Sequence, residues 1–493
     1  MERCRTNIGW AETDITPKRP VLLFGQMYQR VSQYVKEPLK GTALVMENGS
    51  DQATIISLDI TIPPETIMPD IKKRLSHIKG LDTEKITVCA THTHNAYDFG
   101  SPELFPHEII LPKDIQAKIP TPSDIMTHEE GNLFLTDKIV NLVETAWGNR
   151  KLGKVSHGSD YAAVGFNRRP VFRFQNGTDE SIMYGATSKE NFRYFEGTVD
   201  HSVEMIFTWD MEGEATGILL NVSCPSQIYE LHSFISSDYW HDVRNALRDK
   251  LGNIFILPLC GAAGDQNPLD LVRISKANEK ELELWSKQTG EVERNIDMKQ
   301  ECIAIAHRIR DAVLRQFENA SLQANGSFTL KHQVREIELP IRQVEEAEVI
   351  EARKTVDKYI EQFSPDNRMQ AKDMVAMFEP CGIIQRWQEQ QRSKTVAFPL
   401  HMIRIGDAAI VTNPFELFVE YGLRIKARSA ASQTMVVQLA DSSGGYLPSE
   451  SAVAGGSYSA KPASTLCGPD SGDVLCEALL AGIDDLFKDD TVN

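Results

Sequence analysis

The sequence lacks the features that mark membrane-spanning, secreted or nucleic-acid-binding proteins. No uninterrupted apolar stretch approaches the length of a transmembrane helix, and the first 15 residues contain no apolar core of a secretory signal. The net charge of −17 leaves no dominant basic face for a phosphate backbone or an anionic membrane. We therefore expect a cytoplasmic protein with no nucleic-acid partner and no stable membrane association.

The chain is also poor in patterned cysteines and in repeats. Its 8 cysteines form no Cys-x-x-Cys pair and no framework spacing, which predicts reduced thiols. No Gly-Lys-Ser/Thr phosphate loop follows any strand-like run, and no segment has the composition of a disordered linker. With 493 residues, of which 41% are hydrophobic and 25% charged, the chain can bury one large core or two smaller ones.

The hydrophobic pattern predicts one α/β domain over 1–493 with helical insertions. The insertions are polar helical blocks at about 275–318 and 343–393, the second interrupted at Pro365 and at Pro380-Cys381-Gly382, with a strand pair near 327–341 between them. The first block places Ile305, Ile309, Val313 and Phe317 on one helix face. Strands are expected at 54–59, 217–222, 254–258, 402–405, 408–412 and 435–439, and helices at 65–78, 133–147, 239–251 and 474–487.

Two histidines one residue apart, His92 and His94, directly follow the apolar run 86–90. A short β-branched run that ends in polar residues is typical of a buried strand leading into a loop, and ligands bind at the carboxyl ends of strands in open α/β sheets. The pair could hold a metal, or one histidine could hold it while the other moves a proton. The alternative is that both are ordinary loop histidines.

Four further stretches at strand ends have the composition of a site. Arg168, in the turn 165–170, could bind an anion or stabilise an oxyanion, or form a surface ion pair. Cys224 could be a soft metal ligand or a small buried hydrophobe. The small residues of 260–268 could close a loop around a ligand, and Glu416, between apolar residues, requires a metal or an ion-pair partner.

The order of these stretches resembles the neutral/alkaline, non-lysosomal ceramidase family. The motifs that carry this resemblance are short and collinear over most of the chain. They are Ile8-Gly-Trp-Ala-Glu-Thr-Asp-Ile-Thr-Pro17, Thr91-His-Thr-His94, Asn167-Arg-Arg-Pro170, Ile235-Ser-Ser-Asp238, Gly264-Asp265 with Pro268, Pro414-Phe-Glu416 and Ser464-Thr-Leu-Cys-Gly-Pro469.

The resemblance implies layered mixed β-sheets flanked by helices and a zinc hydrolase of N-acyl sphingoid lipids. In that family, zinc is held by two histidines, a glutamate and a tyrosine, and a serine near the metal is the nucleophile. At the matching positions, His92, Glu416 and Tyr446 are the expected metal ligands. The polar groups expected around the substrate carbonyl are His94, Arg168 and Tyr458.

Two positions depart from the family pattern. Cys224 stands where the family has its second zinc histidine, before a proline and eleven residues before Ile235. A thiolate can replace an imidazole on zinc, but it makes the metal a weaker Lewis acid. Asn267 stands where the family has the nucleophilic serine, and an amide cannot attack an acyl carbon. The β-sandwich of the family's secreted members is also not expected here.

The sequence therefore predicts a zinc enzyme for a small polar substrate, with ceramide itself doubtful. In the favoured hypothesis, metal-activated water attacks an amide, ester or lactone. His94 or Asp265 would handle the proton, and Arg168 and Tyr458 would hold the oxyanion. The alternatives are a metal-assisted lyase or isomerase acting on a sugar or sugar acid, and a non-catalytic binding protein. The sequence leaves homo-oligomerisation open.

Overall fold

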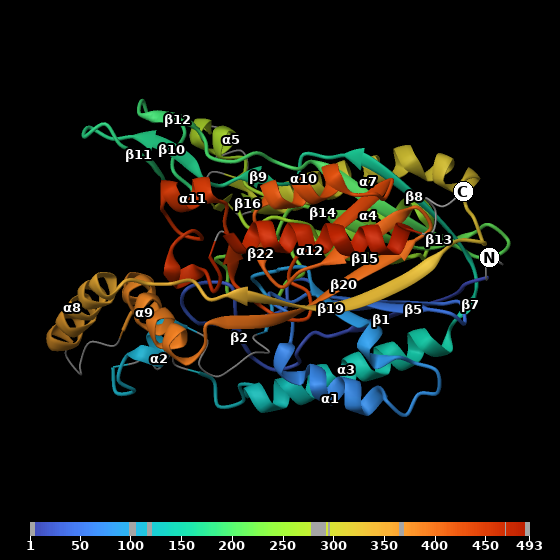
Figure 1. The fold of residues 1–493 in the computed structure, drawn as a ribbon, viewed down its shortest axis with the longest axis horizontal. Coiled ribbons are helices and arrows are strands. Elements are labelled where there is room, and N and C mark those ends of the chain that lie inside the picture. The colour runs from blue at the N-terminus through green and yellow to red at the C-terminus, as the bar shows by residue number, and fades with distance from the viewer. Residues whose placement is uncertain are drawn as a thin grey trace.

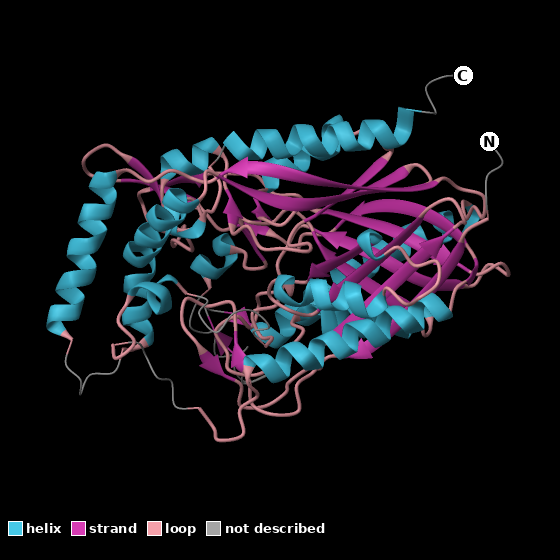
Figure 2. Ribbon diagram, turned by 60° about the horizontal axis from the view of Figure 1, so that its bottom comes forward, coloured by secondary structure: helices cyan, strands magenta, loops and turns pink. Residues whose placement is uncertain are grey.

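Three β-sheets surround one apolar core, and helices cover their outer faces (Figures 1 and 2). The computed structural model describes residues 5–97, 105–115, 121–277, 292–293, 296–363, 369–468 and 470–488. Within these ranges, no helix is both long and apolar enough to cross a membrane. The predicted α/β class with layered mixed sheets is confirmed.

The first sheet has the strand order β6-β5-β4-β1-β7 and pairs β5 with β6 in parallel. Its outer face packs on α1 and on α3, which begins earlier than predicted because Thr127 and Glu130 form a capping box. The bounds are β1 Asn7–Asp14, β4 Lys40–Glu47, β5 Gln52–Leu58, β6 Ile86–Ala90, β7 Lys151–Leu152, α1 Met68–Leu75 and α3 His128–Gly148.

The second sheet has the order β15-β14-β13-β8 and is covered by α4 and α7. The predicted face of α7 is confirmed, because Ile305, Ile309 and Val313 are fully buried and Phe317 packs against the same cluster. Helix α4 has the predicted bounds. The elements are β8 Lys154–Tyr161, β13 Ser202–Trp209, β14 Ala215–Val222, β15 Phe255–Cys260, α4 Tyr239–Leu251 and α7 Met298–Leu322. Residues 278–291 of the first predicted insertion lie outside the described residues.

The third sheet has the order β19-β20-β21-β23, and α10 and α12 pack on its outer face. The strand pair predicted near 327–341 is wrong, because this segment forms the single strand β19, whose partner β20 lies beyond the second insertion. The bounds are β19 Leu330–Pro340, β20 Thr395–Ile405, β21 Ala408–Thr412, β23 Gln433–Val437, α10 Val419–Arg428 and α12 Asp470–Phe487.

The second insertion is a pair of helices, α8 (Glu346–Gln362) and α9 (Ala371–Arg392), that packs on the short helix α2 (Pro106–Ile110). The predicted interruption at Pro380 is wrong, because α9 continues through it. A proline inside a helix costs about 3 kcal/mol, and the burial of Met377, Cys381 and Ile384 against the neighbouring helices offsets that cost. Pro365 lies outside the described residues.

The inner faces of the three sheets share one core, which explains why several strands are apolar on both faces. Its larger members are Trp10, Leu44, Ile55, Ile206, Leu219, Leu257, Ile403, Ile410 and Met435. The remaining elements are short. They are β2 Leu22–Leu23, β3 Arg30–Val31, β9 Phe166–Asn167, β10 Pro170–Arg173, β11 Asp179–Ser181, β12 Phe192–Phe195, β16 Gln266–Asn267, α5 Leu271–Lys276, β17 Val292–Glu293, β18 Ile296–Asp297, β22 Glu416–Leu417, β24 Tyr446–Leu447 and α11 Glu450–Gly455.

A buried chain of polar contacts joins the third sheet to the first. His401 Nε2 lies 3.3 Å from Asp441 Oδ2, His401 Nδ1 lies 2.9 Å from His332 Nε2, and His332 Nδ1 lies 3.2 Å from the Gln52 carbonyl oxygen. Each contact needs one hydrogen, and the carbonyl can only accept. Two neutral imidazoles carry two hydrogens, so the third belongs to Asp441 when all three bonds are made.

This arrangement predicts a pH-dependent contribution of Asp441 to stability. Burial raises the pKa of Asp441 to about 6, whereas an unfolded aspartate titrates near ~4. Between these values the folded state binds more protons, so this group makes the free energy of unfolding fall as pH rises, by up to about 3 kcal/mol in total. In Asp441→Asn the side chain stays neutral, and urea denaturation should show a smaller loss of stability between about pH 4 and pH 7 than in the unmodified protein.

Asp249→Asn, at an exposed position of α4, is the control and should follow the unmodified protein. Identical pH dependence in the Asp441→Asn variant and the unmodified protein would contradict the proton count.

Candidate functional site

The predicted site stretches lie at the carboxyl ends of strands. His92 and His94 follow β6, the segment from Asn221 to Gln227 continues from the end of β14, and the loop after Cys260 follows β15. Glu416 follows β21. Contacts between these segments show that they meet: His92 touches Glu416, and His94 touches Gln227. The convergence expected at strand ends is therefore present.

His92 has a geometry that suits a metal ligand. Its backbone is left-handed, with a φ of 61°, and its Nδ1 lies 2.6 Å from the Thr61 carbonyl oxygen. That carbonyl requires Nδ1 to be the donor, so in the neutral ring Nε2 carries a lone pair. Nε2 lies 3.2 Å from Glu416 Oε2. Two acceptors facing each other at this distance require a proton or a cation between them.

Tyr446 supplies a phenolic oxygen beside Glu416 as a third candidate metal-ligating atom. The strands β22 and β24 are parallel and pair Glu416 with Tyr446 in register, and the two side chains interact. Burial raises the pKa of Glu416, but His92, Tyr446 and Arg168 outweigh burial and lower it overall. The carboxylate is therefore ionised at neutral pH. Burial also raises the pKa of the Tyr446 phenol.

His92, Glu416 and Tyr446 are of the residue types that could hold a zinc ion. Zinc binds imidazole nitrogen and carboxylate oxygen, and the resemblance described above implies a tyrosine as a further ligand. Across the described residues, no three His, Cys, Asp or Glu side chains form a group that could hold a metal. The donor set therefore depends on Tyr446 in addition to His92 and Glu416.

Arg168 and Tyr458 lie beside this donor set. The Arg168 guanidinium is 5.4 Å from the Tyr446 ring centre and 5.9 Å from that of Tyr458, and Nη2 donates to the Gly264 carbonyl oxygen over 2.8 Å. Burial raises the pKa of Tyr458 to about 12, so its hydroxyl keeps its proton at neutral pH. A cation and a neutral phenol are both able to stabilise negative charge on a substrate oxygen.

His94 lies against His92 with the two rings nearly perpendicular and 4.9 Å apart. Its Nε2 is 2.6 Å from Gln227 Nε2, and its Nδ1 is 3.4 Å from Glu230 Oε2. Burial lowers the pKa of His94 to about 4, which leaves a neutral imidazole that can accept a proton. Gly25, with a φ of 110°, touches this ring so closely that a Cβ would lie 2.4 Å from it.

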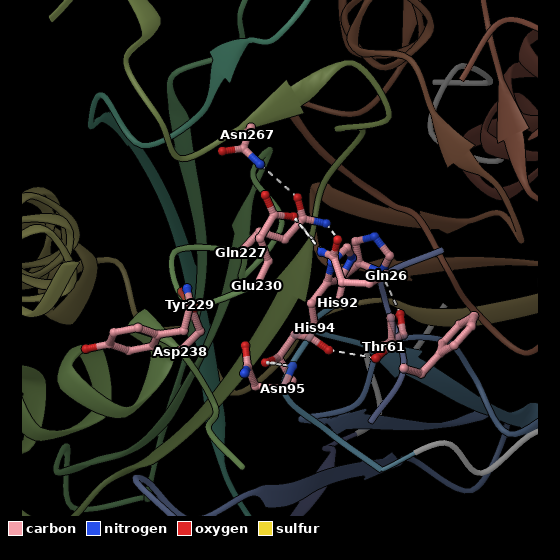
Figure 3. Close-up of polar contacts among 12 residues, drawn as sticks. Gln26, Thr61, His92, His94, Asn95, Gln227, Tyr229, Glu230, Asp238 and Asn267 are labelled. Atoms are coloured by element: carbon pink, nitrogen blue, oxygen red, sulfur yellow. Dashed lines mark hydrogen bonds and ion pairs between the residues drawn. The ribbon is translucent and has the colours of Figure 1, made fainter. Parts of the chain in front are cut away.

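Asn267 is fully buried and continues this chain of polar contacts (Figure 3). Its Nδ2 donates to Gln227 Oε1 over 2.9 Å and to the Tyr184 hydroxyl over 2.7 Å. Its Oδ1 accepts from the Leu269 amide over 3.0 Å. The amide therefore holds Gln227 against His94, and it supplies no nucleophile.

Asp265 anchors the loop after β15. Its two oxygens accept from the Val419 amide over 2.9 Å and from Asn167 Nδ2 over 3.0 Å, and it does not line the cavity. Of the two residues predicted to handle a proton, His94 lines the cavity. This geometry supports His94 over Asp265 for that role.

Cys224 lies in the apolar core under the second sheet, together with Val222 and Tyr239. Its thiol donates to the Pro225 carbonyl oxygen at 3.4 Å, burial raises its pKa, and it does not line the cavity. The structure therefore does not bring Cys224 together with the other three proposed ligands, and its ligation of a metal stays a prediction.

Cobalt substitution tests whether Cys224 binds the metal together with His92, Glu416 and Tyr446. On the geometry above, we expect cobalt-loaded protein to lack the intense charge-transfer absorption of a thiolate ligand, and Cys224→Ala to keep its zinc content within about twofold. Such a band at full occupancy, lost in Cys224→Ala, would show instead that the thiolate binds the metal.

The cavity that contains the site has a volume of about 290 Å³. His92, His94, Glu416, Tyr446 and Tyr458 line it. The remaining wall comes from other segments and includes Phe24, Phe105, Phe378, Arg386 and Glu389. This volume is at the lower limit of the usual range for small-molecule sites.

Gln227 and Glu230 are site residues that the sequence analysis missed. Gln227 lies three residues after Cys224, in a segment that the sequence places at a strand end, so its position indicated the site although its residue type did not. Glu230 lies in an irregular segment between β14 and α4, and its approach to His94 depends on a contact across 136 residues that no local pattern indicates.

The fold is shared with solved ceramidase structures. Neutral ceramidase from Pseudomonas aeruginosa superposes with a TM-score of 0.67 at 14% sequence identity, covering 98% of this chain and 75% of that chain. A ceramidase complexed with C2 gives a TM-score of 0.66 at 14% identity, covering 97% and 74%. No family model and no curated protein sequence matches this chain. The chain therefore has a ceramidase-like catalytic-domain fold, and the resemblance predicted from the motifs is confirmed at that level.

Proposed function

We propose that this protein is a zinc-dependent hydrolase that cleaves an amide, ester or lactone bond in a small polar substrate. The observation that carries the proposal is the approach of His92 Nε2 to Glu416 Oε2 at 3.2 Å, with Nδ1 already bonded to a carbonyl. This pair of facing acceptors, next to Tyr446, suits a cation. The ceramidase-like fold supports the same reaction class.

Zinc, when bound, supplies Lewis-acid chemistry to the substrate carbonyl and to the attacking water. The protein's own residues supply the remaining functions. His94, neutral and held by Gln227 and Glu230, would accept the proton that the water loses and return it to the leaving group. The accepting nitrogen would be Nε2, which Gln227 contacts in this structure. Tyr458, which lines the cavity, stabilises the negative charge on the former carbonyl oxygen. Arg168 is not among the lining residues, and it would supply positive charge from its position 5.9 Å from the centre of the Tyr458 ring.

Water takes the place of a serine nucleophile in this proposal. Asn267 stands where a serine-based reaction would need a hydroxyl, and its amide is engaged by Gln227, Tyr184 and Leu269. The cavity of about 290 Å³ also argues for a substrate smaller than a lipid with two long chains.

A panel of small amides, esters and lactones, incubated with zinc-loaded protein and analysed by mass spectrometry, tests this proposal. We expect at least one substrate to gain the mass of water on conversion, and chelation to stop the reaction. Conversion without a change of total mass would indicate a lyase or isomerase. Bound zinc with no conversion across the panel would overturn the proposal and favour a binding protein.

A further inference from the structure

The wall of the cavity includes a buried arginine that the proposed chemistry does not use. Arg386 lies on α9, is 8% exposed and lines the cavity with Phe378, Gln385 and Glu389. Phe378, Gln385 and Glu389 lie 7 and 4 residues apart and share one face of the helix, and Arg386 lies beside Gln385 at the edge of that face. Phe378 also contacts the Tyr458 ring, with the ring centres 6.0 Å apart. The face of α9 therefore continues the wall of the reactive site.

The known partners of Arg386 leave part of its guanidinium available to a ligand. Nη1 donates to Glu389 Oε2, and Nε makes a long contact of 3.5 Å with the Pro462 carbonyl oxygen. Glu389 is shared, because its other oxygen accepts from Gln385 Nε2 over 3.0 Å. A guanidinium has five N–H donors, so Arg386 can donate further hydrogen bonds into the cavity.

Among the described residues that line the cavity, Arg386 is the one lysine or arginine. A second guanidinium, that of Arg342, lies close enough to Arg386 for Arg386 to disfavour the charge of Arg342, whereas Glu348 favours it. Arg342 Nη1 donates to the Ala460 carbonyl and to Thr465 Oγ1, both over 2.7 Å, and both of these partners are neutral. Each guanidinium thus has one carboxylate that favours its charge, Glu348 for Arg342 and Glu389 for Arg386, and Glu389 is shared with Gln385. A carboxylate of the substrate would add to this compensation through the N–H groups of Arg386 that Glu389 does not engage.

We infer that the substrate carries a carboxylate group that Arg386 binds, while its reactive carbonyl lies toward His92, Glu416 and Tyr446. The planar fork of an arginine matches a carboxylate with two parallel hydrogen bonds. The aromatic side chains of Phe24, Phe105 and Phe378 line the same cavity and suit an apolar or aromatic group of the same molecule. This inference rests on the proposed function and narrows its substrate class to small acylated amino acids and related carboxylates.

Binding of two matched amides tests the inference. N-benzoylglycine carries a carboxylate, and N-benzoylglycinamide is its neutral counterpart. By isothermal titration calorimetry we expect the unmodified protein to bind the carboxylate about tenfold or more tightly than the amide. Arg386→Gln should abolish this preference. Glu389→Gln should increase it, because the variant removes the carboxylate that competes for Arg386.

Arg392→Gln is the matched control, because Arg392 lies on the same helix at an exposed position, and its selectivity should equal that of the unmodified protein. Circular dichroism establishes that each variant is folded, and Glu389→Gln gives an independent result where Arg386→Gln is unstable. No measurable binding of N-benzoylglycine, equal affinity for both compounds, or full selectivity in Arg386→Gln would each overturn the inference.

Measuring release of benzoate from both compounds by zinc-loaded protein separates this inference from the proposed function. Selective binding of N-benzoylglycine, with no cleavage there or in the wider panel, would overturn the hydrolase proposal and leave carboxylate recognition standing. Equal binding and equal cleavage of both compounds would overturn carboxylate recognition and leave the hydrolase proposal standing.

Discussion

Replacing His92 with alanine is expected to remove bound zinc and to lower hydrolysis by about a thousandfold or more. His92 is the proposed ligand whose orientation the protein fixes most directly, through the contact of Nδ1 with the Thr61 carbonyl oxygen at 2.6 Å. Without the imidazole, Glu416 and Tyr446 are two donors, and a catalytic zinc site usually has three protein ligands. Elemental analysis of the purified variant and the rate on the best substrate of the panel measure the two effects.

His77→Ala is the control for this prediction, because His77 is an exposed histidine that contacts Arg74 and Glu144 on the surface. It should keep both the zinc content and the rate of the unmodified protein. A His92→Ala variant that retains stoichiometric zinc would contradict the proposed donor set.

Replacing Arg169 with alanine is expected to lower the free energy of unfolding by about 3–5 kcal/mol. The Arg169 guanidinium is fully buried. It donates to both carboxylate oxygens of Glu196, over 2.7 and 3.1 Å. Its other N–H groups donate to the carbonyl oxygens of Tyr458, Ala452 and Gly456. Removing it leaves a buried carboxylate without its cation and frees the segment that carries Tyr458, so the rate should fall as well.

Arg173→Ala, on the neighbouring strand β10, provides the comparison. Arg173 forms an exposed ion pair with Asp179, and loss of such a pair changes stability little. Urea denaturation of the two variants measures the difference. An Arg169→Ala variant as stable as Arg173→Ala would show that the buried network does not hold the Tyr458 segment.

The adjacent arginines Arg168 and Arg169 show what the sequence could and could not predict. The motif placed a guanidinium at the site, and the structure brings Arg168 to Tyr446 and Tyr458. No local pattern assigns Arg169 a different role, because both residues occupy the same turn. Their separation depends on Glu196 and on the carbonyls near Tyr458, which only the folded chain brings to Arg169.

The helices and strands that the sequence predicts correctly are those determined by local patterns, and the errors lie where distant parts of the chain decide the structure. Helix α4 was predicted with its observed bounds because its pattern and caps are local. The partner of β19 was not, since β20 begins 55 residues after the end of β19. Pro380 predicted a break by its local chemistry, and the packing of Met377 and Ile384 on neighbouring helices overrides it. The proximity of His92 and Glu416 could be predicted from the sequence because both follow strands, and strand ends share one edge of a layered fold.

The division of the cavity between two kinds of wall has a consequence for engineering. The reactive groups sit on strand ends that are fixed by three sheets and their common core, whereas Phe378, Arg386 and Glu389 belong to a helical pair that packs on α2 in a separate apolar cluster. Randomising the cavity face of α9 should therefore yield variants that accept different molecules while the hydrolytic groups and the stability of the sheet core are retained. In such a library, changes on α9 would alter which molecules bind, and the unchanged strand-end residues would keep the reaction the same.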